Sequence, residues 1–186
     1  MPSRADRAYV IRSTASTATF GVGVAVLAAG LGWLTVRGDR ETLAAVVVPA
    51  LLLAWALWIL LYRPAVRYDA VAATIVNIGR VHVLPWARVG EVEQRLNLVF
   101  RLDDGRKVDA WGAPYPAKPG LIARRLDRDS AARYDFRTHE TALENVRVAA
   151  APSEAPVVSR WDRAPLTAGA VLAAGLVVEL VVAHAS

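Results

Sequence analysis

Residues 43–62 read LAAVVVPALLLAWALWILLY and contain no charged side chain. An α-helix rises about 1.5 Å per residue, so about 20 apolar residues match the ~30 Å hydrocarbon core of a bilayer. A core helix of a soluble protein is usually shorter, and it is amphipathic with a period of 3.6 residues. This stretch is apolar all round, and it is therefore predicted to span a membrane.

Two further apolar blocks lie on either side of this stretch. Residues 13–36 form the first, and they carry no charge between Phe20 and Leu34. Residues 164–186 contain the other, whose core from 165 to 183 carries one charge, Glu179. The sequence therefore predicts an N-terminal region 1–62 made of a tail and two transmembrane helices, and a third transmembrane helix within 164–186.

The first block is predicted to be a retained anchor and not a cleaved signal peptide. Thr35-Val36-Arg37 follows the apolar run, where a cleavage site would show a small-x-small pattern.

Basic residues near the spans predict the orientation, because lysine and arginine accumulate on the cytoplasmic side. The N-terminal tail and the flanks of the central region are rich in arginine, whereas the arginines of the short first loop are offset by Asp39 and Glu41. We expect a multi-pass plasma membrane protein with its N-terminus and central domain in the cytoplasm and its C-terminus outside. Four aromatic residues are expected at the inner interface: Trp55, Trp58, Tyr62 and Trp161.

Small residues recur at four-residue spacing in two of the spans. Gly21, Ala25 and Ala29 form one such stripe, and Gly169 and Ala173 form another. This spacing lets helix backbones approach closely in a membrane. It favours packing of the three helices within one chain, and a homodimer through the first span is the alternative.

Glu179 is the one ionisable group inside the predicted spans. An acidic residue at such a position is a functional hypothesis in itself. It lies near the predicted outer end, where it could reach the interface or pair with Arg37 or Arg40. Its presence keeps open a second function, that of a transporter or channel subunit. Transport sites usually require several polar groups near the bilayer midplane, however, and these spans do not supply them.

The central region begins with a β-rich pattern, predicted to form a domain over residues 63–130. Alternating apolar residues such as those of 96–102 indicate strands, and Asp104-Gly105 is typical of a tight hairpin. About six short strands are predicted, over 66–69, 73–78, 80–84, 89–95, 96–102 and onward from 108.

The alternating pattern of apolar residues ends after Trp111, where several prolines follow. A helix is predicted over 119–129 and a second short one over 142–148. Residues 131–163 are assigned as a polar segment and linker. The expected fold is a small antiparallel β-barrel or curled sheet closed by a helix.

A family resemblance rests on three features: Arg63-Pro64 after the second span, Pro85-Trp86 at a strand boundary, and the Asp-Gly hairpin. With these features residues 43–112 resemble the bacterial PH-like domains of actinobacterial membrane proteins, among them the family of the mycobacterial low-molecular-weight protein antigen 6. The resemblance implies a membrane α + β protein with a PH-like domain and no defined activity. The third span departs from the two-span layout of that family.

Residues that could carry chemistry lack the spacing that chemistry requires. There is no cysteine, the three histidines do not have metal-ligand spacing, and no serine lies in a nucleophile elbow. Asp103 and Asp104 are explained by their hairpin turn. The sequence therefore predicts no catalytic residue, no cofactor, no metal site and no enzyme.

The chain is basic, with a net charge of +5. Arg124, Arg125 and Arg128 of the predicted helix could contact anionic headgroups, each contributing about 1 kcal/mol near the surface. Asp127 and Asp129 interleave with them, which favours a solvated helix face. Acidic residues are interspersed throughout, so nucleic acid is not an expected partner.

The predicted function is that of a membrane-tethered interaction module at the inner face. It would bind a protein partner, whose identity the sequence does not give, or the lipid surface of the bilayer.

Overall fold

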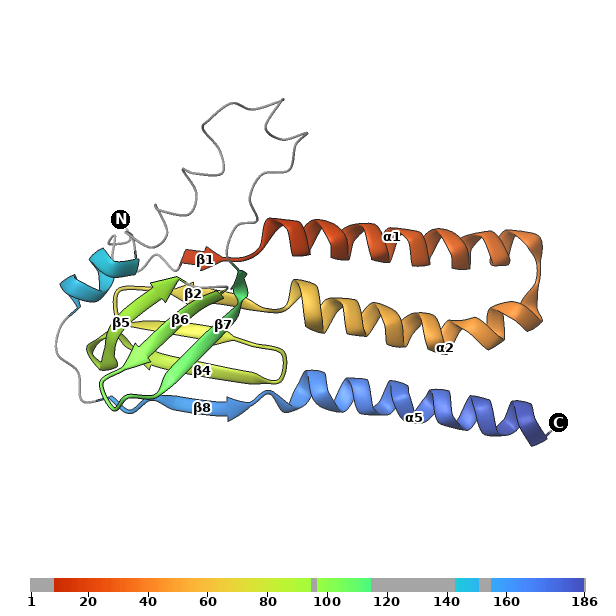
Figure 1. Cartoon of the computed structure of the whole chain (residues 1–186). Helices are drawn as coiled ribbons and strands as arrows, with labels where there is room; N and C mark the ends of the chain where they lie inside the picture. Colours follow the sequence, from red (N-terminus) through yellow and green to blue (C-terminus); the bar gives the residue numbers. More distant parts are fainter. Residues whose placement is uncertain (1–8, 95–96, 115–142, 151–154, 186) are drawn as a thin grey trace, which may run out of the picture. The chain divides into compact units, whose positions relative to one another are not determined.

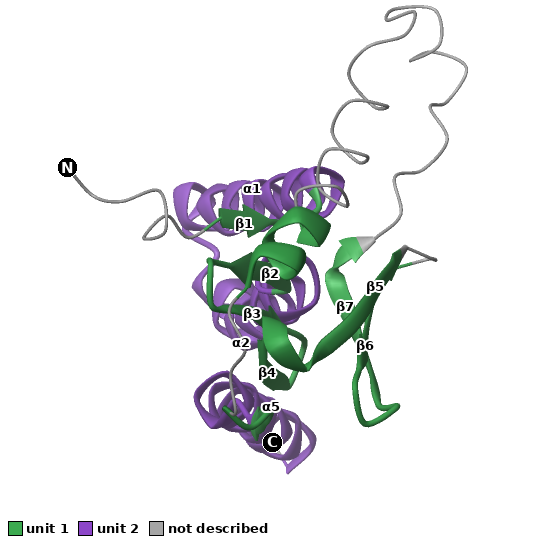
Figure 2. Ribbon diagram, turned by 90° about the vertical axis from the view of Figure 1, so that its left-hand side faces the viewer, with its two compact units in different colours: residues 1–13, 64–160 green, residues 14–63, 161–186 purple. Residues whose placement is uncertain are grey.

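The structure is a computed structural model of the 186-residue chain, and it describes residues 9–94, 97–114, 143–150 and 155–185. The chain divides into two compact units (Figure 2). One contains residues 14–63 and 161–186 and is called the helical unit here. The other contains residues 1–13 and 64–160 and is called the β unit.

The helical unit confirms the three predicted apolar helices (Figure 1). They are α1 (Thr14–Arg37), α2 (Arg40–Leu57) and α5 (Arg163–Ala185). The α2 helix continues through Pro49 and ends in a π-helical turn, η2 (Trp58–Tyr62). Each helix is long and apolar enough to cross a membrane.

A tight connection joins α1 to α2. Gly38 adopts a φ of 72°, a conformation that glycine reaches without steric cost. Asp39 then caps α2, because its carboxylate accepts a hydrogen bond from the backbone N–H of Thr42 at 3.0 Å. These two residues reverse the chain, so that α1 and α2 form a helical hairpin.

The β unit consists of two antiparallel sheets, one ordered β1-β2-β3-β4-β8 and one ordered β5-β6-β7. The six predicted strands are confirmed, but they do not form one meander. A 3-10 turn, η3 (Trp86–Arg88), follows β4 and leads the chain into the second sheet. The strands are β1 (Tyr9–Ile11), β2 (Ala65–Tyr68), β3 (Ala72–Val76), β4 (Arg80–Pro85), β5 (Val89–Gln94), β6 (Asn97–Leu102), β7 (Lys107–Pro114) and β8 (Val158–Trp161).

Two of these strands were not predicted. β1 pairs with β2 in antiparallel register, Val10 opposite Arg67, although the sequence suggested an N-terminal tail. β8 lies at the other edge of the same sheet, although the sequence suggested a linker. Both strands are short, and neither shows the alternation that marks a half-buried strand.

The second sheet has two local features, a tight hairpin and a bulge. Gly105 has a φ of 83° and closes the β6–β7 hairpin, as the Asp-Gly pair predicted. Gly90 lies at a register shift between β5 and β6. This bulge lets Val89 and Val92 both face the core, even though they are three residues apart.

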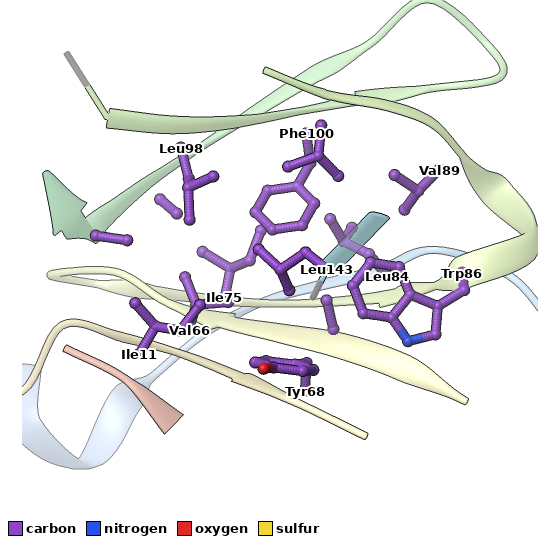
Figure 3. Close-up of a cluster of buried hydrophobic side chains, with 14 of the residues drawn as sticks. Ile11, Val66, Tyr68, Ile75, Leu84, Trp86, Val89, Leu98, Phe100 and Leu143 are labelled. Carbon is purple, nitrogen blue, oxygen red and sulfur yellow. The ribbon is translucent and has the colours of Figure 1, made fainter. Parts of the chain in front are cut away.

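The core lies between the two sheets (Figure 3). Its largest fully buried side chains include Trp86, Phe100 and Ile75. Leu143, which is 0% exposed, reaches this core from a helical stretch at 143–149, in agreement with the short helix predicted over 142–148. Among the described residues, no polar or charged residue is buried.

The β7 strand is tied to the first sheet by polar and steric contacts. The side chain of Asn77 donates to the carbonyl of Asp109 at 2.8 Å and accepts from the N–H of Trp111 at 3.0 Å. The N–H of Ser13 donates to the carbonyl of Gly112 at 3.1 Å. Gly112 also lies so close to the backbone of residues 64–65 that a Cβ atom would overlap it.

Three strands of the first sheet continue into the three apolar helices. Arg12 and Ser13 connect β1 to α1, Arg63 and Pro64 connect η2 to β2, and Asp162 alone connects β8 to α5. Because β1 and β2 pair in one sheet, their residues lie on the same side of any membrane that α1 and α2 cross.

Candidate functional site

Four polar side chains of the helical unit bond to backbone carbonyls of their own helices. The hydroxyl groups of Thr19, Thr35 and Thr167 donate to backbone carbonyls three or four residues earlier, at 3.0, 2.8 and 2.9 Å. The Nδ1 atom of His184 lies 2.8 Å from the carbonyl of Leu180. These groups are therefore engaged locally and do not form a shared polar site.

Trp55 holds α2 against α5. Its indole Nε1 donates to the carbonyl of Pro165 at 3.0 Å, and a Cβ atom on Gly169 would overlap its ring. The sequence placed Trp55 in an aromatic belt at the membrane interface. The indole contributes to the packing of the two helices, for which the glycine provides the space, and its position at a membrane interface stays a prediction.

An ion pair joins the ends of the same two helices. Arg63 follows η2, Asp162 precedes α5, and their side chains form a salt bridge. The Arg63 side chain is only 8% exposed and that of Asp162 is 33% exposed. Losing one partner would leave a mostly shielded charge without its counterion, which is costly.

Alanine at Gly169 is expected to displace Trp55 and to weaken the α2–α5 contact by about 1–3 kcal/mol. Thermal unfolding of the full-length protein in detergent micelles, followed by tryptophan fluorescence, measures this loss. Gly175→Ala is the matched control, because its Cβ would lie 3.7 Å from Val48, an ordinary contact. Equal melting temperatures for both variants would contradict the packing described.

The small-residue stripe of the first span does not carry packing within the chain. Nothing lies within 4 Å of a Cβ atom placed on Gly21. The contact of α1 with α2 instead uses Gly23, where a Cβ would approach Leu57 to 2.8 Å, and the rings of Phe20 and Tyr62, 4.9 Å apart. Each residue turns a helix by 100°, so Gly21 and Gly23 lie on nearly opposite faces. The favoured interpretation of this stripe was therefore wrong, whereas Gly169 does pack against a helix.

Glu179 differs from the other polar groups of the helical unit. Its Oε2 atom is enclosed and has no hydrogen-bond partner among the residues that the structure describes. It continues a line of less exposed residues on α5 that includes Gly169, Leu172 and Leu176. Because Gly169 contacts Trp55, this line faces α2.

Arg37 and Arg40, which the sequence suggested as partners of Glu179, do not pair with it. The guanidinium group of Arg37 lies over the ring of Trp33 at 4.8 Å from its centroid. Arg40 is exposed at the start of α2. Among the ion pairs of the described residues, none involves Glu179.

Charged side chains on the β unit are largely paired with one another. The hairpin carboxylates that the sequence assigned to a turn each meet an arginine, Arg88 with Asp103 and Arg106 with Asp104, both at 2.7 Å. Hydrogen bonds from Arg106 lower the pKa of the Asp104 carboxyl. The remaining pairs join Arg101 to Glu91 and Glu93, and Arg147 to Glu144. These contacts give the carboxylates structural partners and leave them poorly placed for proton transfer.

Within the part of the chain that the structure describes, no group of three metal-ligating side chains is found. His82 lies on β4 opposite the buried Ile75, so its ring is on the core-facing side of the sheet. Burial lowers the pKa of His82, and the charge of Arg80 lowers it further.

The lowered pKa of His82 predicts a pH dependence of stability. In the unfolded chain His82 binds a proton near its ordinary pKa of about 6.5, whereas the folded chain binds it only at lower pH. The neutral form of His82 contributes its full share to the free energy of unfolding above about pH 6.5. This contribution is lost as the pH falls through the lowered pKa of the folded state. Unfolding of the full-length protein between pH 7.5 and pH 5 should show this decline, and His82→Gln should flatten it. An unchanged slope in the variant would contradict the assignment.

Several sequence predictions fall outside the described residues. Arg124, Arg125 and Arg128, the proposed contacts with an anionic surface, are among them, as is the helix predicted over 119–129.

Two sets of contacts that stabilise the fold were not predicted from the sequence. Asn77 was assigned only to a turn, and the Arg63–Asp162 pair joins residues 99 positions apart, for which one sequence offers no signal.

Two candidate sites follow for the described chain: Glu179 in the helical unit and the exposed surface of the β unit. No protein family model, no curated protein and no solved structure matches this sequence.

Proposed function

We propose that this protein is a membrane-tethered interaction module at the inner face of the plasma membrane, where its β unit binds a protein partner or the lipid surface without catalysis. The observation that carries this proposal is the way the first sheet joins the apolar helices. β1, β2 and β8 each connect to a helix through one or two residues. Such connections span only about 3.5 Å per residue, so a bilayer crossed by the helices keeps the β unit at its surface.

A PH-like assignment is supported by the core of the β unit. Two antiparallel sheets enclose a wholly apolar cluster, to which Leu143 adds a side chain from a helical stretch. A small sheet domain closed by a helix is the arrangement that the family resemblance implies. A domain of this type can bind a partner through its surface. Such binding does not require an ionisable group in the core.

The cytoplasmic orientation rests on the distribution of arginine. Arg12, Arg63 and Arg163 lie at or next to the helix ends that join the β unit, and Arg160 lies in the adjoining strand β8. The α1–α2 connection carries Arg37 and Arg40, but Asp39 and Glu41 lie beside them. The bias toward positive charge on the cytoplasmic side favours the β unit inside.

Tethering also sets the affinity that such a module needs. A ligand in or on the same membrane meets the β unit at a high effective concentration, so weak intrinsic binding is sufficient.

Photo-crosslinking in native membranes tests this function. A photoreactive amino acid is placed in the full-length protein at Val71, Trp111 or Val148, which are 70%, 59% and 72% exposed. We expect at least one position to give a discrete adduct with one protein or with lipid, resolved by mass spectrometry. Val26, which is 65% exposed on α1, serves as the control for random capture in the bilayer. Adducts no more abundant than those at Val26 would contradict the proposal.

A second candidate function, a subunit of a transporter or channel, is favoured by one observation, the enclosed and unpartnered Oε2 of Glu179. It would use this carboxyl group and the close packing at small residues such as Gly169. Full rescue of a deletion strain by Glu179→Gln would exclude it. A loss of solute flux with normal membrane levels of the variant would favour it.

A further inference from the structure

We propose that Glu179 is the docking point for a membrane-spanning helix of a second protein, and that this helix carries a lysine or arginine at the depth of Glu179. The inference rests on the proposed function and deepens it, because it names the chemistry of one partner.

Glu179 lacks the compensation that several other polar groups of the helical unit have. Three threonines of the spans bond to their own helices, Trp55 bonds to Pro165, and Arg63 pairs with Asp162. In the helical unit, Oε2 of Glu179 is the one enclosed side-chain oxygen or nitrogen atom without a partner among the described residues. A carboxyl group in hydrocarbon is costly to leave unpaired, and such groups generally mark pairing sites.

A partner can reach this carboxyl group. Oε2 is enclosed, and Glu179 continues the line of residues through which α5 faces α2. Beside Glu179 on the helix surface lie three exposed valines, Val171, Val178 and Val182, which are 71%, 62% and 61% exposed. Their spacing of seven and four residues places them on one stripe, called the valine face here. A helix that packs along the valine face would bring its side chains next to the carboxyl group of Glu179.

Charge complementarity identifies the partner, because the carboxylate of Glu179 requires a positive charge beside it. Arg37 and Arg40 are the basic residues nearest to the same end of the spans, and Arg37 is engaged with Trp33. Neither pairs with Glu179 within the chain. The interiors of α1, α2 and α5 contain no lysine or arginine, so a second copy would offer no cation at this depth. The complementary charge therefore comes from a different chain.

The depth of Glu179 suits such a pair. Ala185, at the end of α5, is the sixth residue after Glu179, which corresponds to about 9 Å along the helix. A lysine or arginine of a partner helix can extend its aliphatic part along the valines and place its charge at this level. The carboxylate of Glu179 and the positive charge of the partner would then shield each other from the lipid.

The test is photo-crosslinking from Val178 in the full-length protein in native membranes. We expect one membrane-protein adduct, whose yield falls at least tenfold in Glu179→Gln and further in Glu179→Lys. Glu41→Gln is the matched control, since Glu41 is an exposed acid in the first turn of α2. Its yield should equal that of the wild type.

Charge exchange completes the test once mass spectrometry has identified the adduct. The captured segment should contain a lysine or arginine, and replacing that residue with glutamate should restore the adduct in the Glu179→Lys background. The proposal is overturned by an unchanged yield in Glu179→Gln, by capture of a second copy alone, by a captured segment without a basic residue, or by no adduct.

The adducts from Val71, Trp111 and Val148 separate this outcome from the proposed function. If they persist while Val178 captures nothing, the docking inference fails and the proposed function stands. If all four positions fail, the proposed function fails as well.

Discussion

Replacing Gly112 with alanine should strongly destabilise the β unit and lower its melting temperature. The added Cβ would overlap the backbone of Pro64 and Ala65, which belong to the start of β2. Backbone atoms cannot move aside as the tip of a side chain can, so β7 or β2 must shift. Overpacking typically costs about 1–3 kcal/mol and occasionally more, and a clash with backbone belongs at the upper end, a large fraction of the stability of a small domain.

The loss is measured by thermal unfolding of the full-length protein in detergent micelles, followed by the circular dichroism of β-structure. Gly90→Ala is the control in the same sheet, because its Cβ would meet only the carbonyl oxygen of Arg101 at 3.7 Å. If both variants have the melting temperature of the wild type, the close approach of β7 to residues 64–65 is not present in solution.

Trp86→Ala should be similarly damaging, with a loss of about 3–5 kcal/mol. Trp86 is 1% exposed, and its ring centroid lies 6.4 Å from that of Tyr68 and 6.5 Å from that of Phe100. Its indole N–H donates to the carbonyl of Asp69 at 2.8 Å. Truncation therefore opens a cavity between the sheets and leaves a carbonyl without its donor.

Trp111 offers a matched control for this prediction. It is also a tryptophan of the β unit, but it is 59% exposed on β7. Trp111→Ala should change the free energy of unfolding by no more than about 0.5 kcal/mol. Denaturant titrations of both variants measure the difference, and similar losses would contradict the position of Trp86 in the core.

The helices could be predicted from the sequence because the requirement for spanning a bilayer is simple. A helix must be apolar over about 20 residues, and this property is local to each segment. The strands with a clear alternation, such as β6, could be predicted for the same reason. β1 and β8 could not, because three or four exposed residues become a strand only when a partner lies beside them.

The candidate site was predicted only in part. Glu179 could be found because it is a lone charge in an apolar stretch, but its enclosed oxygen depends on how α5 faces α2. The stripe through Gly21 has the spacing of a packing motif, yet it lies on the face of α1 away from Leu57. Spacing shows that residues share a helix face, and it does not show which partner the face meets.

We propose that three helices cross the membrane and hold the β unit on the cytoplasmic side. The chain has no cysteine, so single cysteines can be introduced and labelled with a membrane-impermeant maleimide in intact cells. Val71→Cys and Val148→Cys report on the β unit, whereas Glu41→Cys and Ala185→Cys report on the opposite helix ends.

We expect labelling of the cysteines at 41 and 185 in intact cells, and of those at 71 and 148 only after the cells are permeabilised. Labelling of 71 and 148 in intact cells would contradict the cytoplasmic orientation. The same accessibility at all four positions would contradict the three spans themselves.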